Sequence, residues 1–286
     1  MEPTLKDTNI GRMAAIAKEL NRSLSMSIRP LFFIDGQKQA LRPLSSSVMV
    51  RVNAQKLMFT AAHVMRKDSF RNELSHAAVG VATPGGQLAS FKNSEALCSA
   101  LQKQGQDLDV GIVRLQDETC GSLEDCHFLD EDEWELKHKD NRTGDSFYML
   151  LGYPSSRKLT KICKYQITQH SLCICTYPAS AEWHGKLHLP ATNHMLLQWN
   201  ERNVTHSGEP RNIWDVKGMS GGGVFHVSKE TGRARLVGII AEHHRQSRLI
   251  VATRIDSFVL LAAAYSQPAV RALLRTKPGN SSGHET

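Results

Sequence analysis

The sequence contains no hydrophobic run long enough to cross a membrane. A spanning helix needs about 20 consecutive apolar residues, whereas the longest apolar stretches, residues 236–241 and 259–264, are the size of core segments. Of the 286 residues, 41% are hydrophobic and 22% are charged, a balance typical of a folded globular protein and not of a disordered chain. We therefore expect no membrane span.

The N-terminal region also lacks the pattern of a secretory signal. Such a signal has a basic start, an apolar stretch of about 7–15 residues and a small-residue cleavage site. Charged residues interrupt this region, and its best apolar run is residues 13–17. We therefore expect a cytoplasmic location, in which the six cysteines stay reduced, although their even number would allow disulfides.

No long run of lysine and arginine is present. The net charge of +7 comes from 35 basic and 28 acidic residues that are spread along the chain. A nucleic-acid-binding arm would concentrate them. Nucleic-acid binding is therefore the least favoured hypothesis, and strong salt-dependent binding would be needed to support it.

What the sequence does contain is a series of short strands between turn signals. A hairpin is predicted from residues 48–52 and 56–59, which flank a turn at residues 53–55. Further strands are predicted at residues 28–34, 79–82, 110–115, 147–152, 159–167, 172–176, 195–199, 223–227, 236–241 and 249–253. Helices are predicted near both ends, at residues 8–24 and from a cap at Asp256 onward. The pattern indicates an all-β sandwich or barrel.

Three segments carry residues suited to nucleophilic catalysis. A histidine, His63, follows a strand directly, which would hold a general base rigidly. Asp109 opens an apolar strand, from which a carboxylate can orient a histidine ring. Ser220 lies in the glycine-rich run GMSGGG, where glycines permit an exposed hydroxyl and converging backbone N–H groups.

The glycine-rich run does not fit the common phosphate-binding or hydrolase loop motifs. The run does not end in Gly-Lys-Ser/Thr, as a P-loop does. It also lacks the sequence context of a dinucleotide-binding fingerprint. The letters match the nucleophile elbow Gly-x-Ser-x-Gly, but that motif requires the order Ser, Asp, His. Here the candidate histidine and aspartate both precede the serine.

In the order His63, Asp109, Ser220, the three segments resemble the chymotrypsin-like, or trypsin-like, serine peptidases. The resemblance spans about residues 28–276, but only these three motifs are specific. It implies an all-β fold of two antiparallel six-stranded β-barrels with the site in the cleft between them, followed by a C-terminal helix.

The resemblance also implies roles for single residues. Ser220 would be the nucleophile, His63 the base that takes and returns its proton, and Asp109 the residue that orients the histidine, with Asp107 as the alternative. The backbone N–H groups of Gly218 and Ser220 would form the oxyanion hole. No metal or other cofactor is needed for this chemistry.

Substrate preference depends on residues around the implied specificity pocket. The position six before the serine is Trp214, which would shorten the pocket and favour small apolar side chains. A shift of one residue would place Asp215 there instead and favour lysine or arginine, although Asp215 also suits a turn. By resemblance, the segment with Gly238, Ile239 and Ile240 would pair with the substrate backbone.

One departure points to a branch of the family. Secreted members that are activated by cleavage carry an aspartate before the serine, whereas this chain has Met219. The chain therefore resembles the intracellular or bacterial branch, and too few residues follow residue 255 to form a PDZ module. The expected units are an N-terminal helical extension (1–27), a first barrel (28–118), an acidic connection (119–145), a second barrel (146–255), C-terminal helices (256–276) and a disordered tail (277–286).

We therefore expect a serine endopeptidase that acts on polypeptides through an acyl-enzyme and is activated by a partner or ligand that orders its cleft. The alternative is a binding or scaffold protein that keeps the peptidase fold without catalysis. A zinc site at Cys173, Cys175 and His170 is not favoured, because no second pair of ligands follows at the spacing of a zinc finger.

Overall fold

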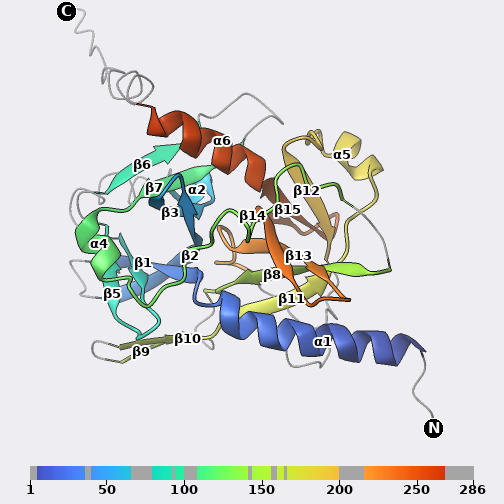
Figure 1. Cartoon of the computed structure of the whole chain (residues 1–286), viewed down its shortest axis with the longest axis horizontal. Helices are drawn as coiled ribbons and strands as arrows, with labels where there is room; N and C mark the ends of the chain where they lie inside the picture. The colour runs from blue at the N-terminus through green and yellow to red at the C-terminus, as the bar shows by residue number, and fades with distance from the viewer. Residues whose placement is uncertain are drawn as a thin grey trace, which may run out of the picture.

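The computed structural model shows a protein built mainly of strands in two antiparallel sheets (Figure 1). It describes residues 5–35, 40–65, 79–91, 94–99, 108–140, 144–155, 160–163, 166–199 and 216–267. The predicted all-β class of chymotrypsin type is confirmed, with seven strands instead of six in the N-terminal sheet.

The first sheet is formed by residues of the N-terminal half, in the order β5-β4-β1-β2-β3-β7-β6. Its strands are β1 (Ile28–Asp35), β2 (Ala40–Val52), β3 (Gln55–Thr60), β4 (Val79–Ala82), β5 (Leu88–Ser90), β6 (Glu95–Cys98) and β7 (Gly111–Arg114). The short strands β5 and β6 were not predicted; they form the two ends of the sheet.

The second sheet has six strands in the order β11-β8-β13-β14-β15-β12. They are β8 (Ser146–Gly152), β11 (Leu172–Thr176), β12 (His194–Gln198), β13 (Gly223–Ser228), β14 (Ala234–His244) and β15 (Leu249–Arg254). The single strand predicted at residues 159–167 was wrong: β9 (Thr160–Cys163) and β10 (Gln166–Gln169) form a separate two-stranded hairpin.

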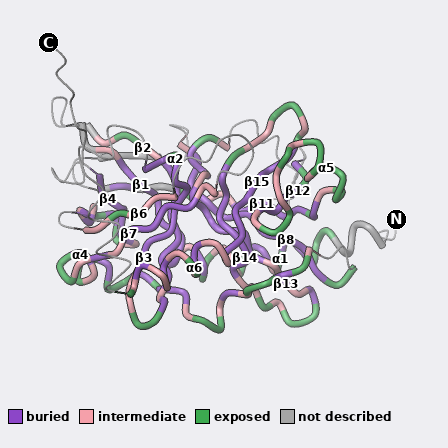
Figure 2. The backbone as a smooth tube through the Cα atoms, turned by 90° about the horizontal axis from the view of Figure 1, so that it is seen from above, coloured by how far each residue is buried: buried purple, intermediate pink, exposed green. Residues whose placement is uncertain are grey.

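Alternation along the strands explains how both faces of a sheet are buried. In β8, Phe147, Met149 and Leu151 face a core shared by the two sheets, while Tyr148 and Leu150 face the interior of the second sheet. Side chains of a strand point to opposite faces in turn. Figure 2 shows this burial running through the strands, with exposed stretches in the connections.

Helix α1 (Leu5–Leu24) packs against the second sheet although it precedes the first (Figure 1). Met13 and Ala17 enter the shared core, and Ser171 Oγ donates to Asn21 Oδ1 at 2.9 Å beside β11. The remaining described helices are α2 (Ala62–Met65), α4 (Asp117–Gly121), α5 (Glu182–Lys186) and α6 (Ile255–Ser266). None of the helices in the described part of the chain is long and apolar enough to cross a membrane.

The C-terminal helix begins at Ile255, two residues earlier than a cap at Asp256 predicts, and Asp256 does not cap it. The helix starts without a side-chain cap, and Asp256 Oδ1 instead accepts a hydrogen bond from Lys137 N–H at 2.7 Å. The second helix predicted after residue 267 and the tail at residues 277–286 lie outside the described residues.

The acidic segment between the sheets is not the solvated connection that its composition predicts. Leu129 is fully buried. Its carbonyl accepts the Arg51 N–H and its N–H donates to Met49 O, so it bonds to both neighbours of Val50 in β2. Trp134 forms a second parallel bridge, in which Leu236 of β14 bonds to Glu133 O and to Glu135 N–H on either side of it. The segment therefore runs along both sheets, because its charged residues alternate with buried apolar ones.

The β2–β3 hairpin closes on two residues in the left-handed region, Asn53 at φ 48° and Ala54 at φ 62°. Such a turn favours glycine at its second position. We expect Ala54→Gly to raise the free energy of unfolding by about 0.5–1 kcal/mol, because relief of left-handed strain exceeds the added chain entropy. Urea unfolding would measure it.

The matched control is Ala15→Gly, at an exposed position inside helix α1. There the glycine relieves no strain and should lower stability. Equal effects of the two substitutions would contradict the proposed strain at Ala54.

Candidate functional site

His63 lies where β3 ends and α2 begins. Ala61 and Ala62 are fully buried beside it, and their small side chains allow the chain to turn inward closely after Thr60. The His63 side chain itself keeps 45% of its surface exposed. The turn therefore presents the imidazole to the surface from a rigid base.

Asp109 holds His63 by two hydrogen bonds. Its Oδ1 accepts the His63 backbone N–H at 2.7 Å, and its Oδ2 lies 2.7 Å from His63 Nδ1. The two residues meet because β7, which begins at Gly111, pairs with β3 at Thr60. With Nδ1 bound to the carboxylate, Nε2 is the ring nitrogen left to exchange protons.

Ser220 lies in a tight turn before β13. Met219 N–H donates to Val216 O and Gly222 N–H to Met219 O. Gly218 has φ +94° and Gly221 φ +84°, a region that L-residues rarely adopt. A side chain at Gly221 would also lie within 2.1 Å of Ser46 O.

Ser46 of β2 connects this turn to the first sheet. Its N–H donates to Ser220 O at 2.9 Å, and its Oγ donates to Gly218 O at 2.8 Å while accepting Tyr153 N–H at 2.8 Å. Thr60 Oγ1 donates to Ser46 O at 2.9 Å. Sequence reasoning missed this fully buried serine, because its contacts depend on residues more than 100 positions away.

The structure brings His63, Asp109 and Ser220 together in the wall of one cleft of about 490 Å³. Two of them come from the first sheet and one from the second. Among the described contacts, no hydrogen bond joins Ser220 Oγ to His63. Such bonds are often long in the absence of substrate and tighten when it binds.

The residues expected to form an oxyanion hole have suitable backbone groups. Within the described chain, the N–H groups of Gly218 and Ser220 donate to no backbone carbonyl, whereas Met219 N–H between them is bonded. Two donors of the same turn are thus left for an oxygen of a bound molecule.

Of the predicted substrate-binding residues, some lie outside the described residues and others lie away from the cleft. Trp214, Asp215 and the alternative Asp107 lie outside the described residues. Gly238 and Ile239 are paired on both edges, with β13 and with β15, so they leave no edge for a substrate strand and do not line the cleft.

Ile240 lines a small pocket behind Ser220, and the cleft wall continues with Ala241, Glu242 and His243. Sequence reasoning assigned no role to Glu242, whose charge does not fit the apolar pattern of the strand. The pairing of β14 with β15 shifts register between Ile240 and Glu242, beside the part of the strand that lines the cleft.

The cysteines whose side chains are described are free thiols. Cys173 and Cys175 are buried where β11 meets α1. The pKa of Cys173 is raised well above its usual value by a hydrogen bond with the Cys175 thiol and by burial. Exposed His170 does not form a cluster with them that could hold a metal ion; among the described residues, the side chains that cluster in this way lie elsewhere.

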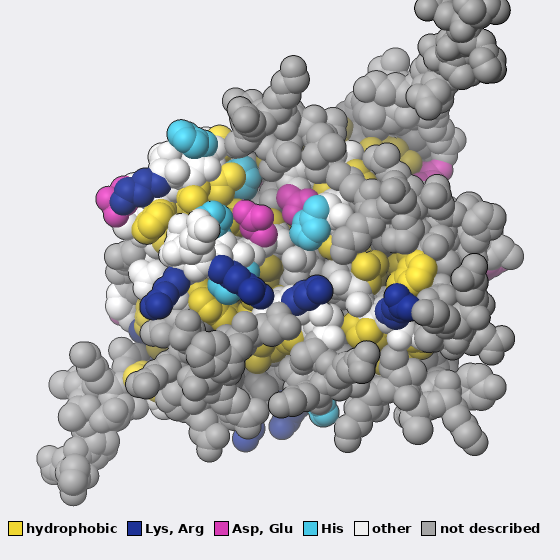
Figure 3. Space-filling model, turned by 180° about the vertical axis from the view of Figure 1, so that it is seen from behind, with side chains coloured by type: hydrophobic (Ala, Val, Ile, Leu, Met, Phe, Trp, Pro, Cys, Tyr) yellow, Lys and Arg dark blue, Asp and Glu magenta, His cyan; other side chains and the backbone are white. Residues whose placement is uncertain are grey.

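Charge on the surface is mixed. On the face shown in Figure 3, histidine and acidic side chains lie next to one another, and the described lysines and arginines form a row of separate side chains below them. The net charge of +7 is therefore not gathered into a continuous basic patch on the described part of this face.

Comparison with known proteins supports the fold. No protein-family model matches the sequence, and no curated protein does. Among solved structures, the VesB protease of Vibrio cholerae is similar, with a TM-score of 0.51 and 13% identity over 84% of this chain. The match covers 64% of the VesB chain, just under two thirds. At this identity the likeness shows a shared fold and nothing more.

We expect Ser46→Ala to lower the free energy of unfolding by about 1–3 kcal/mol, because it leaves the buried Gly218 carbonyl and Tyr153 N–H without their partner. The control is Ser47→Ala, which removes one bond, to Arg29 O, and should cost about 1 kcal/mol. Urea denaturation of both variants compares them; a smaller loss for Ser46→Ala than for Ser47→Ala would contradict the stabilising role of the two Ser46 bonds.

Proposed function

We propose that this protein is a serine endopeptidase of the chymotrypsin-like class. The observation that carries the proposal is the pair of 2.7 Å hydrogen bonds that fix His63 on Asp109 in the same cleft as Ser220. An imidazole held at Nδ1 by a carboxylate is set up to act as a base at Nε2. The fold shared with a known protease is consistent with this chemistry.

The reaction begins when Ser220 Oγ attacks the carbonyl carbon of a peptide bond. His63 Nε2 takes the hydroxyl proton as the new C–O bond forms, and Asp109 stabilises the resulting imidazolium. His63 then gives that proton to the leaving nitrogen as the C–N bond breaks. Water repeats the sequence on the acyl-enzyme and releases the acid.

The negative charge that develops on the carbonyl oxygen is stabilised by backbone donors. The N–H groups of Gly218 and Ser220 belong to one turn. Hydrogen bonds from Ser46 to Ser220 O and Gly218 O fix the position of this turn. Donors that are already in place cost no reorganisation during the reaction, which makes such stabilisation effective.

The edge of β14 near the cleft suits an extended polypeptide. The turn before β13 accompanies β14 only as far as Ile240, through bonds with Gly221 and Gly222. Beyond that point, at Ala241 and Glu242, no described strand lies on this edge. A substrate could add there as a further strand. This assignment replaces the one at Gly238 and Ile239.

The alternative is a binding protein that keeps the peptidase fold without catalysis. No hydrogen bond between Ser220 and His63 is described. This is consistent with a resting cleft that a partner or ligand must activate, and equally with a non-catalytic binding protein. A cytoplasmic location and the choice of side chain in the pocket remain predictions from the sequence.

We expect a fluorophosphonate probe to label the wild-type protein at Ser220, because an activated serine attacks phosphorus as it attacks a carbonyl. Ser220→Ala should abolish labelling and His63→Ala should reduce it strongly, while the exposed Ser122→Ala should not change it. Absence of labelling in wild type, with correct folding, would favour the non-catalytic alternative or a cleft that requires a partner.

Asp109→Asn tests the orienting carboxylate. We expect the labelling rate to fall by a factor of up to about 10⁴, the loss in kcat that this substitution causes in serine-peptidase triads. The surface variant Asp132→Asn is the matched control. Near-normal labelling of Asp109→Asn would show that Asp109 does not set the His63 tautomer.

A further inference from the structure

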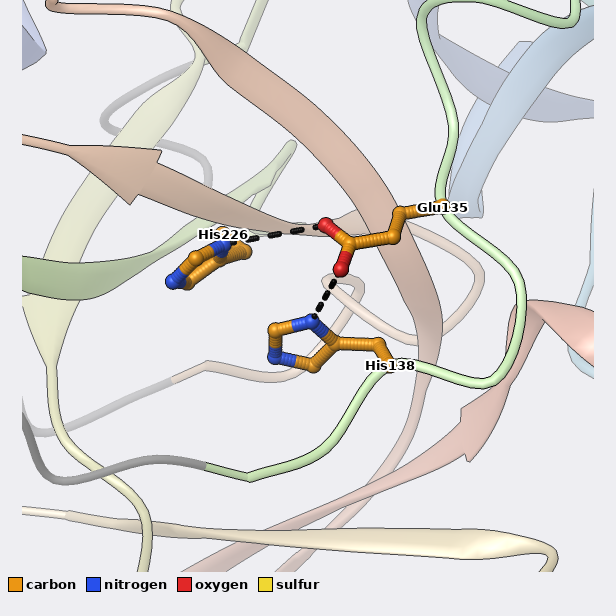
Figure 4. A group of neighbouring side chains, drawn as sticks. All are labelled: Glu135, His138 and His226. Atoms are coloured by element: carbon orange, nitrogen blue, oxygen red, sulfur yellow. Dashed lines mark hydrogen bonds and ion pairs between the residues drawn. The ribbon is translucent and has the colours of Figure 1, made fainter.

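A second group of titratable side chains lies away from the cleft. Glu135 and His138 belong to the segment that joins the sheets, and His226 belongs to β13; their side chains converge (Figure 4). None of the three lines the cleft. They lie beside Tyr148, about 13 Å along β8 from Gly152, which packs against the Ser220 turn.

The three side chains point their ligand atoms at one another. His138 Nδ1 lies 3.0 Å from Glu135 Oε1, and His226 Nδ1 lies 3.8 Å from Glu135 Oε2. All ligand atoms of the group lie within 4.8 Å of one another. The 3.8 Å separation is too long for a hydrogen bond, so the carboxylate and His226 face each other across a gap.

These distances suit a small tetrahedral ion. Ligands about 2.0–2.1 Å from a zinc ion lie roughly 3.3 Å from one another. The two observed separations, 3.0 and 3.8 Å, bracket that value. All three ligand atoms lie within 4.8 Å of one another, so side-chain movements alone would bring them around one ion.

The surroundings of His138 resemble those of a metal-binding histidine. Its other ring nitrogen, Nε2, lies 2.6 Å from the buried Tyr148 hydroxyl, and its side chain is only 4% exposed. Metal-binding histidines usually engage their second nitrogen in a hydrogen bond, which sets the ring orientation. Tyr148 therefore holds Nδ1 toward Glu135.

The charges around the group place the Glu135 carboxylate against both imidazoles. Burial and the neighbouring His138 lower the pKa of His226. The nearby cation Arg254 is directed elsewhere: it bonds to His138 O at 2.8 Å and to Asp140 Oδ2 at 2.6 Å. The charge nearest to the gap is thus the Glu135 carboxylate.

We propose that Glu135, His138 and His226 bind a divalent transition metal ion of the zinc class. Two imidazoles and one carboxylate supply three protein ligands, a set that suits zinc, whereas calcium and magnesium prefer oxygen alone. Glu135 and His226 are 33% and 25% exposed, so water reaches the fourth position. The ion would tie the connecting segment to β13 of the second sheet.

The test is a titration of chelator-treated protein with Zn²⁺ and, separately, Co²⁺. We expect one equivalent to bind, a melting temperature that rises with Zn²⁺ concentration, and the intense visible absorption of tetrahedral cobalt without a sulfur charge-transfer band. His226→Ala and Glu135→Gln should each weaken binding at least tenfold. The matched control is His127→Ala, which removes an exposed histidine paired with a single carboxylate, Glu133.

The same titration of His63→Ala excludes a metal bound in the cleft, and binding by Ser220→Ala separates this site from the proposed peptidase activity. No binding to folded wild-type protein would overturn the proposal. So would equal affinity in the wild type and His226→Ala, or a cobalt spectrum that shows thiolate ligands. If Glu135→Gln does not fold, His226→Ala and the cobalt spectrum of the wild type still test the proposed metal site.

Discussion

Hydrogen bonds between β2 and the turn at residues 216–222 are the constraint on which the cleft depends. They join the two sheets at the place where His63 from one and Ser220 from the other must meet. Their short length requires the turn backbone to lie directly against β2, so Gly221 leaves no space for a side chain. The two halves of the site are therefore positioned by backbone and hydroxyl groups, which have little freedom to move.

A shared apolar core supports this contact. Strands of both sheets send every second side chain into it, and α1, α6 and the connecting segment cover its margins. Because Leu129 and Trp134 pair with strands of different sheets, the connecting segment also fixes how the sheets lie relative to each other. The fold thus places its chemistry at a junction that several independent contacts define.

The sequence predicted what depends on neighbouring residues and missed what depends on distant ones. His63, Asp109 and Ser220 stand in short motifs that can be read locally, and the resemblance of their order to a known family implied that they meet in one cleft. Ser46 looks like any strand serine until Gly218 is placed beside it. His138 and His226 are far apart in sequence, and the composition of the acidic segment concealed the alternation that buries it.

The position of α1 has a consequence for the order of folding. Its partner residues on the second sheet, such as Ser171 beside Asn21, follow it by 150 positions. During synthesis α1 has no strand of the second sheet to pack on until β11 has been made. Contacts of such long range slow folding and leave apolar surface exposed in the meantime. The apolar face of α1 is thus a surface that must be kept from aggregating until β11 has been made.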